Sequence, residues 1–113
     1  MLTRRVKGVP LYPVRLCVMI YDEVDDLPYC YRELAHGSVG FYHCGSDLRE
    51  FLLAVRSGGD MGTIAHESEH VKNKIFAAIG YETDNMNDEV DAYLLGWIVM
   101  FVLDVYKLHG GVR

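Results

Sequence analysis

The sequence predicts a small α+β fold, in which a sheet of about three strands packs on three helices. The first half of the chain contains runs that are typical of strands, and the second half contains apolar residues at helical spacing. The chain has 113 residues and half of them are apolar. This is enough for one hydrophobic core but not for two, so we expect a single domain over residues 1–113.

Four elements, three strands and one short helix, are expected before residue 60. Residues 14–21 alternate well enough for a strand. Residues 29–35 and 38–43 are expected to be two further strands, joined at His36-Gly37. A short helix should follow, with Asp47 and Glu50 as a capping box and Gly58-Gly59 at its end. Its core stripe would be Leu48, Phe51, Leu52 and Val55.

Two longer helices are expected after residue 60. The first is capped by Asp60 or Thr63 and stops at Gly80, with a core stripe of Ile64, Val71, Ile75, Ala78 and Ile79. The second begins near residues 85–88 and contains the apolar run 92–103, which is too short for a bilayer span of about 20 residues. We expect it to be the buried central helix, with Leu94, Ile98, Phe101, Val102 and Val105 in the core. An exposed part of it could instead form a homodimer interface. Residues 107–113 are expected to be a frayed tail.

The segment His66-Glu67-Ser68-Glu69-His70 is an H-E-x-x-H pentapeptide on the first of these two helices. Residues four apart lie on the same helix face, so both imidazoles can bind one zinc ion. The Glu67 carboxylate lies beside the pair, where it can accept a proton from a water activated by the metal. The pentapeptide therefore predicts a zinc hydrolase.

A catalytic zinc site usually needs a third protein ligand. A metzincin would have Gly and His at positions that are Asn73 and Phe76 in this chain, so that class is excluded. Glu89, in the first turn of the last helix, is the expected third ligand. The alternative carboxylates at similar range are Asp84, Asp88 and Asp91.

The stretch from Gly62 to Val102 resembles the gluzincins, metallopeptidases whose H-E-x-x-H helix is followed by a second helix with a glutamate ligand. It is most similar to their minimal versions, the minigluzincins, and to small H-E-x-x-H proteins of phages and mobile elements. The resemblance implies a zincin-like domain. The resemblance implies zinc held by His66, His70 and Glu89, with Glu67 as the general base. Gluzincins commonly have Asp or Ser four residues after the glutamate ligand, where this chain has Tyr93. Tyr93 would either orient a ligand or polarise a substrate carbonyl.

The expected activity is hydrolysis of a peptide or protein substrate. In gluzincin-like proteins an edge strand beside the active-site helix binds extended peptide, and residues 37–43 are the candidate segment here. The alternative is a catalytically inactive or metal-stabilised interaction protein of phage type, which binds a host or defence target. A further alternative is a protease fragment whose partner supplies the substrate groove.

Charge and composition limit the partners and the location. The net charge of −5 argues against a nucleic-acid partner, because phosphate binding needs clustered Lys and Arg. No membrane partner is expected. Residues 1–13 lack the pattern of a secretory signal, and three widely spaced cysteines give no disulfide framework. We therefore expect a cytoplasmic protein.

Overall fold

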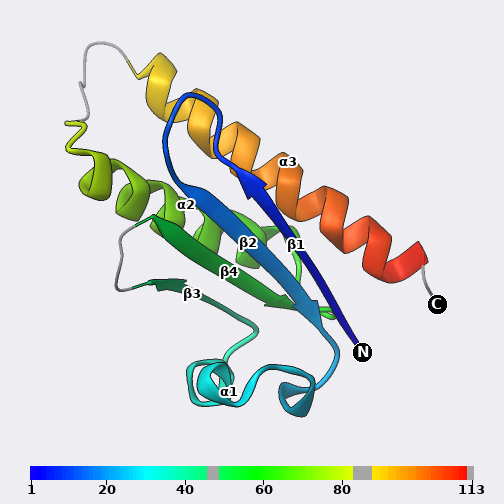
Figure 1. Cartoon of the computed structure of the whole chain (residues 1–113). Coiled ribbons are helices and arrows are strands. Elements are labelled where there is room, and N and C mark those ends of the chain that lie inside the picture. Colours follow the sequence, from blue (N-terminus) through cyan, green and yellow to red (C-terminus); the bar gives the residue numbers. More distant parts are fainter. Residues whose placement is uncertain (46–48, 83–87, 112–113) are drawn as a thin grey trace.

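Four strands form one mixed sheet and three helices pack on it (Figure 1). The computed structural model describes residues 1–45, 49–82 and 88–111. The elements are β1 (Leu2–Gly8), β2 (Arg15–Tyr21), a 3-10 turn η1 (Val24–Asp26), α1 (Tyr29–Ala35), β3 (Gly40–Cys44), β4 (Glu50–Arg56), α2 (Met61–Ile79) and α3 (Glu89–Gly111). The α+β prediction is confirmed, but the sheet has four strands instead of about three.

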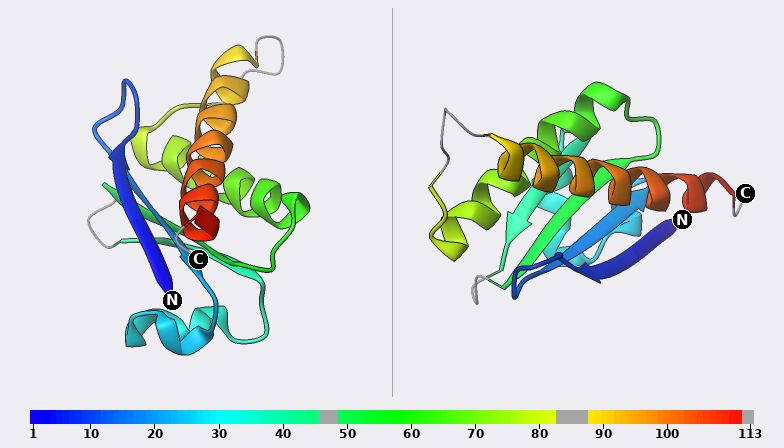
Figure 2. Two further views of the ribbon diagram at one scale, coloured as in Figure 1. Left: turned by 90° about the vertical axis from the view of Figure 1, so that its right-hand side faces the viewer. Right: turned by 90° about the horizontal axis from the view of Figure 1, so that it is seen from above.

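The helices cover the sheet unequally. The strand order is β1-β2-β4-β3, with β2 and β4 parallel and the other pairs antiparallel. On one face, α2 lies over β3 and β4 while α3 lies over β1 and β2 (Figure 2). The shorter α1 packs with η1 near the other face. The main core therefore lies between β2, β4 and the two long helices.

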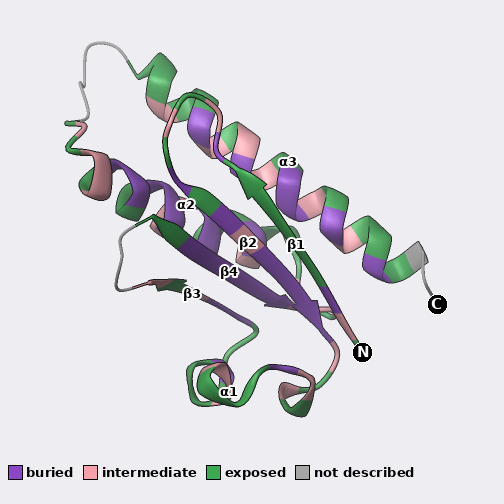
Figure 3. Ribbon diagram, viewed as in Figure 1, coloured by how far each residue is buried: buried purple, intermediate pink, exposed green. Residues whose placement is uncertain are grey.

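Burial follows this layering. β2 and β4 are buried for most of their length, whereas β1 is largely exposed (Figure 3). Alternate side chains of the central strands face the two long helices: Leu16, Val18, Ile20, Phe51, Leu53 and Val55. The five core residues predicted for the last helix, Leu94, Ile98, Phe101, Val102 and Val105, are all buried in the same cluster. The expectation that this helix is fully buried is wrong, because its outward side chains are exposed.

The predicted strand at residues 29–35 is wrong, because this segment is α1. Pro28 precedes the helix and Gly37 follows it with a φ of 74°, the left-handed conformation common just after a helix. Leu27, Tyr31 and Ala35 are spaced four apart and pack in one cluster. This helical spacing was masked by the aromatic residues, which favour strands.

The predicted short helix after residue 47 is also wrong, because Glu50–Arg56 is the central strand β4. Glu50 begins the strand, while Asp47 and Leu48 lie outside the described residues. Both faces of β4 are covered by other elements, so its side chains are apolar in succession. A short continuous apolar run of this kind does not distinguish a buried strand from a buried helix.

Two further segments differ from expectation at the ends of the chain. β1 was not predicted, because an exposed edge strand with three basic residues lacks a clear apolar alternation. Residues 107–111 continue α3 and are no frayed tail. Buried His109 contacts β1 through Thr3, with 2.9 Å between Nδ1 and Oγ1, and its Nε2 lies 2.9 Å from Oδ1 of Asp22.

The helix that carries the pentapeptide is confirmed as α2, with Asp60 as its N-cap. The Asp60 carboxylate accepts hydrogen bonds from the backbone N–H and the hydroxyl of Thr63, at 2.9 and 3.1 Å. Gly80 ends the helix in the left-handed conformation, as expected. Among the described helices, none is both long and apolar enough to cross a membrane.

Candidate metal and catalytic site

The two pentapeptide histidines converge on one face of α2. His66 Nε2 lies 3.2 Å from His70 Nε2, and the rings are nearly perpendicular, with centroids 4.7 Å apart. The His66 side chain is 68% exposed, so its nitrogen is open to solvent and to a ligand. The pair is therefore accessible and is already arranged with both Nε2 atoms on the same side.

This distance can be compared with the geometry of zinc. Two imidazole nitrogens at about 2.0 to 2.1 Å from one tetrahedral zinc would lie about 3.3 Å apart. The 3.2 Å separation of the Nε2 atoms of His66 and His70 is close to that value. The two nitrogens are thus at a distance compatible with a shared zinc ion, and in the structure they are within hydrogen-bond distance of each other.

Glu67 lies next to the pair and is buried, with its side chain 11% exposed. Its Oε1 atom is 4.0 Å from Nε2 of His66. Among the described residues, this contact is the one ion pair or hydrogen bond found for the carboxylate. Buried carboxylates normally accept hydrogen bonds, so a carboxylate left with so little pairing at a pocket wall indicates a functional position.

The edge strand β3 forms the opposite wall of the site. A Cβ atom added at Gly40 would lie 3.2 Å from Cγ of Glu67 and 3.0 Å from Cγ2 of Thr63, so the strand approaches α2 closely. Two residues further along, the Tyr42 ring stacks on His70 with centroids 4.9 Å apart and planes inclined by 21°. β3 therefore contacts Glu67 and His70, two of the three pentapeptide residues with a predicted role in the site.

These contacts were not anticipated from the sequence, although segment 37–43 was expected to form an edge strand beside the active-site helix. β3 is an edge strand and does lie beside α2. The alternation along β3 places Gly40 and Tyr42 on one side, facing α2, and Phe41 and His43 on the other. This alternation was the signal in the sequence that could have predicted the contacts. To use it, however, one must know which side of the strand faces α2.

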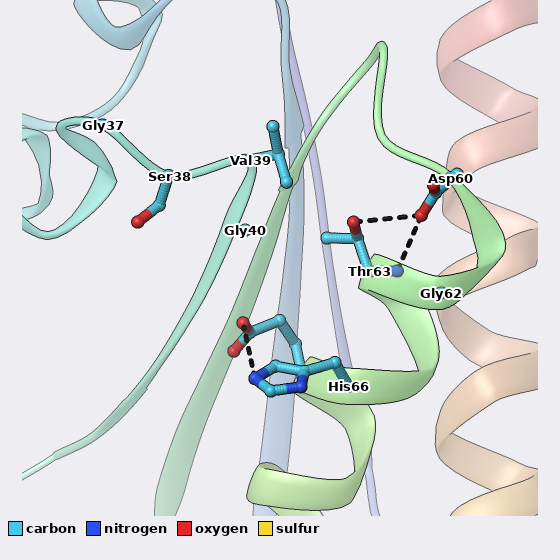
Figure 4. Close-up of a pocket in the computed structure, with 9 residues that line it drawn as sticks. Gly37, Ser38, Val39, Gly40, Asp60, Gly62, Thr63 and His66 are labelled. Atoms are coloured by element: carbon cyan, nitrogen blue, oxygen red, sulfur yellow. Dashed lines mark hydrogen bonds and ion pairs between the residues drawn. The ribbon is translucent and has the colours of Figure 1, made fainter.

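The space between β3 and the start of α2 is an open pocket of about 530 Å³ (Figure 4). His66 and Glu67 line it from α2, and the chain from Gly37 to Gly40 lines it from the strand side. The remaining lining residues are Asp60, Gly62 and Thr63, at the first turn of α2. Small residues dominate the lining, so an extended backbone could approach His66 and Glu67 closely.

The predicted third ligand and Tyr93 lie elsewhere on the fold. Glu89 is exposed at the start of α3, and Tyr93 is 61% exposed on the outward side of that helix. The described residues contain no group of three His, Cys, Asp or Glu side chains able to hold one ion. The ligand role of Glu89 and the catalytic role of Tyr93 therefore stay predictions.

The other carboxylates considered as ligands also have known positions, with one exception. Asp91 lies 2.5 Å from the ammonium of Lys72, which is buried and joins α3 to α2. Successive helical residues turn by about 100°, so Lys72 and His70 point to nearly opposite sides of α2. Asp88 is exposed before α3, and Asp84 lies outside the described residues.

Comparisons of this chain with protein-family models, with curated proteins and with solved structures gave no match. The site is therefore interpreted from its own geometry and from the pentapeptide.

Proposed function

We propose that this chain is a zinc-dependent peptidase with a gluzincin-like site, in which His66 and His70 bind the metal and Glu67 is the general base. The observation that carries the proposal is the convergence of the two Nε2 atoms, 3.2 Å apart, beside a pocket that His66 and Glu67 line. Zinc at this position would supply a Lewis acid that polarises a carbonyl and acidifies water.

Glu67 has the position that a general base requires. Its carboxylate borders the same pocket as His66 and is little engaged by the rest of the protein. It would take a proton from the attacking water as the water oxygen bonds to the scissile carbonyl carbon. It would then deliver that proton to the amine nitrogen as the carbon–nitrogen bond breaks. Proton and charge therefore return to their starting state in each turnover.

The edge of β3 supports a peptide as the substrate. Because β3 pairs with β4 alone among the strands of the described residues, the N–H and C=O groups on its other side are available to an added strand. Main-chain pairing there would lay an extended peptide along the pocket that His66 and Glu67 line. Such binding uses the backbone of the substrate, and side-chain selectivity would come from the pocket.

Glu89 remains the proposed third ligand. The contact between Lys72 and Asp91 holds the first turn of α3 against α2, on the side of α2 that is nearly opposite to His70. Glu89 is in that first turn, and the segment that leads into it includes residues 83–87, which lie outside the described part of the chain. Of the two rival carboxylates that the structure describes, Asp91 is paired with Lys72 and Asp88 is exposed before α3.

The first experiment is the zinc content of the purified protein, measured by mass spectrometry for the wild type and for single variants. We expect about one zinc per chain in the wild type and loss of zinc in His66→Ala and Glu89→Ala. Asp88→Ala is the matched control, since it removes the neighbouring carboxylate and should retain zinc. A wild type that binds no zinc after incubation with the metal would overturn the proposal.

The second experiment separates binding from catalysis. Glu67→Gln keeps the size of the side chain and removes its basicity, so it should retain zinc but lose at least about 100-fold in peptide cleavage. Cleavage that is unchanged in this variant, with zinc bound, would exclude Glu67 as the base.

A second candidate is an interaction protein that binds a host or defence target without catalysis. It is favoured by the position of Glu89, because the described residues offer no third ligand beside the two histidines, and two histidines alone would bind zinc weakly. In this candidate the unpaired edge of β3 would be the docking surface. A binding function does not require a general base. Biological activity that survives Glu67→Gln would therefore select this candidate.

A further inference from the structure

The outward face of α3 is apolar where a surface helix is usually polar. The core-facing side of the helix is formed by residues such as Leu94, Ile98 and Val105. On the opposite side, Tyr93 is 61% exposed and Met100 is 58% exposed. Residues 92–103, all of which the structure describes, contain no charged side chain. A helix that is apolar all round is normally covered on all sides.

The outward residues follow the spacing of a helix–helix seam. Exposed Tyr93, Gly96 and Met100 and half-buried Leu103, which also touches the core, are separated by three, four and three residues. This is the alternation of a heptad seam. Continuing this spacing by four residues in each direction gives Glu89 at one end and Lys107 at the other. The seam therefore has an apolar centre and oppositely charged ends.

Gly96 indicates that something approaches this face closely. Glycine in the middle of a helix costs about 1 kcal/mol relative to alanine. A Cβ atom added at Gly96 would meet nothing within 4 Å, so packing inside this chain does not require glycine there. A neighbour that packs against the outward face would explain the small residue.

We propose that the partner on this face is a second copy of the chain, with the two α3 helices antiparallel about a twofold axis near Ile98. In this register Gly96 of each copy faces Met100 of the other, so a long exposed side chain meets the smallest residue. Tyr93 faces Leu103 in the same way. The contact is self-complementary, as a twofold interface must be.

The charges at the ends of the seam select this orientation and register. Antiparallel pairing places the acidic start of α3, with Glu89 in the first turn and Asp88 just before it, beside Lys107 of the second copy. A parallel pair would place like charges together, and a shift by one heptad would place Lys107 against Gly96. Antiparallel helices also have opposed dipoles, which is favourable. If Glu89 binds zinc, Asp88 remains as the carboxylate next to Lys107.

The interface is compatible with an open site in each copy. The histidine pair lies on the flank of α2 that faces β3, whereas α3 contacts α2 through Lys72 on the other flank. The seam is on the side of α3 turned away from its core. The inference therefore does not rest on the proposed peptidase activity.

The oligomeric state can be tested by sedimentation velocity over a dilution series. We expect a concentration-dependent dimer for the wild type, and Met100→Glu should weaken dimerisation at least about tenfold because a charge is placed in the seam of both copies. Leu34→Glu is the matched control, since Leu34 is an exposed apolar residue of α1, on the other side of the sheet. This variant should dimerise like the wild type. A wild type that is monomeric throughout, or a Met100→Glu dimer of unchanged strength, would overturn the proposal.

Cysteine cross-linking tests the register itself. In a background in which the exposed Cys30 is replaced by serine, one preparation carries Gly96→Cys and another carries Met100→Cys. Mild oxidation of the mixture should give a disulfide between the two variants faster than either variant gives alone. Faster cross-linking of Gly96→Cys to itself would overturn the antiparallel register, because it would indicate a parallel pair.

Discussion

The close approach of β3 to α2 gives a prediction whose size can be estimated from the structure. A methyl group added at Gly40 would lie 3.0 Å from Cγ2 of Thr63, 3.2 Å from Cγ of Glu67 and 3.3 Å from the carbonyl oxygen of Ala54. Carbon atoms in contact prefer about 3.5 to 4.0 Å, so the Gly40→Ala side chain must displace its neighbours by roughly 0.5 Å or more. The edge strand and the helix would be pushed apart at the site.

Two effects of opposite sign determine the stability of Gly40→Ala. Overpacking a filled position costs about 1 to 3 kcal/mol. Replacing glycine by alanine also restricts the unfolded chain, which returns about 0.4 to 1 kcal/mol. We therefore expect a net loss of about 1 to 2 kcal/mol in the free energy of unfolding. Displacement of Glu67 should lower peptide cleavage as well, with zinc content unchanged.

The assay is urea unfolding at equilibrium, with two comparison variants. Gly8→Ala is the matched control, because Gly8 ends the other edge strand and its added methyl would meet nothing within 4 Å. Thr63→Ser removes the nearest methyl but keeps the hydroxyl that bonds to Asp60, so in the Gly40→Ala background it should restore about half of the loss. A Gly40→Ala protein as stable as Gly8→Ala, or no restoration by Thr63→Ser, would refute the steric argument.

Two further predictions concern charged groups on α2. Burial disfavours the charged form of Lys72, but hydrogen bonds to Asp91 and Glu69 outweigh the effect of burial and raise the pKa of Lys72. The contribution of charged Lys72 to stability should therefore persist at neutral pH and be lost as the pH rises through that raised pKa. Lys72→Met should lower the free energy of unfolding by about 1 to 2 kcal/mol at neutral pH. In unfolding curves recorded at several pH values, this variant should also lack the decrease in stability that the wild type shows at alkaline pH. Lys74→Met, at an exposed position of the same helix, should change neither quantity. Hydrogen bonds from Thr63 lower the pKa of Asp60. The ionised cap therefore stabilises the helix fully at a pH above the ordinary aspartate pKa, and this stabilisation is lost as the pH falls through the lowered pKa. Asp60→Ala should lower Tm at neutral pH but not in strong acid, and an equal decrease at both pH values would contradict the cap.

The sequence predicted the long helices better than the strands. α2 has matching caps and a clear apolar stripe, and the core side of α3 repeats at helical spacing, so local signals agree with the fold there. β4 could not be assigned locally, since its apolar run results from burial on both faces by distant elements. Exposed β1 had the opposite difficulty, because its few apolar residues give little alternation.

For the site, the sequence identified the residues of one helix but not their surroundings. The helical spacing of His66 and His70 predicted that their side chains converge, and the Nε2 atoms do lie 3.2 Å apart. The stacking of Tyr42 on His70 and the fit of Gly40 against Glu67 depend on the placement of an edge strand that is distant along the chain. The contributions of Glu89 and Tyr93 depend on how α3 begins, and they stay predictions.

The position of α3 as the last element has a consequence for synthesis on the ribosome. Both central strands, β2 and β4, have been synthesised once residue 56 has been added. The part of their surface that α3 covers stays uncovered until the residues of α3 up to Val105 have been synthesised. At ordinary elongation rates this interval lasts roughly a few seconds. During that time the nascent chain exposes apolar strands that can pair with other chains. A chaperone that binds extended apolar segments would therefore be expected to hold this chain until α3 emerges.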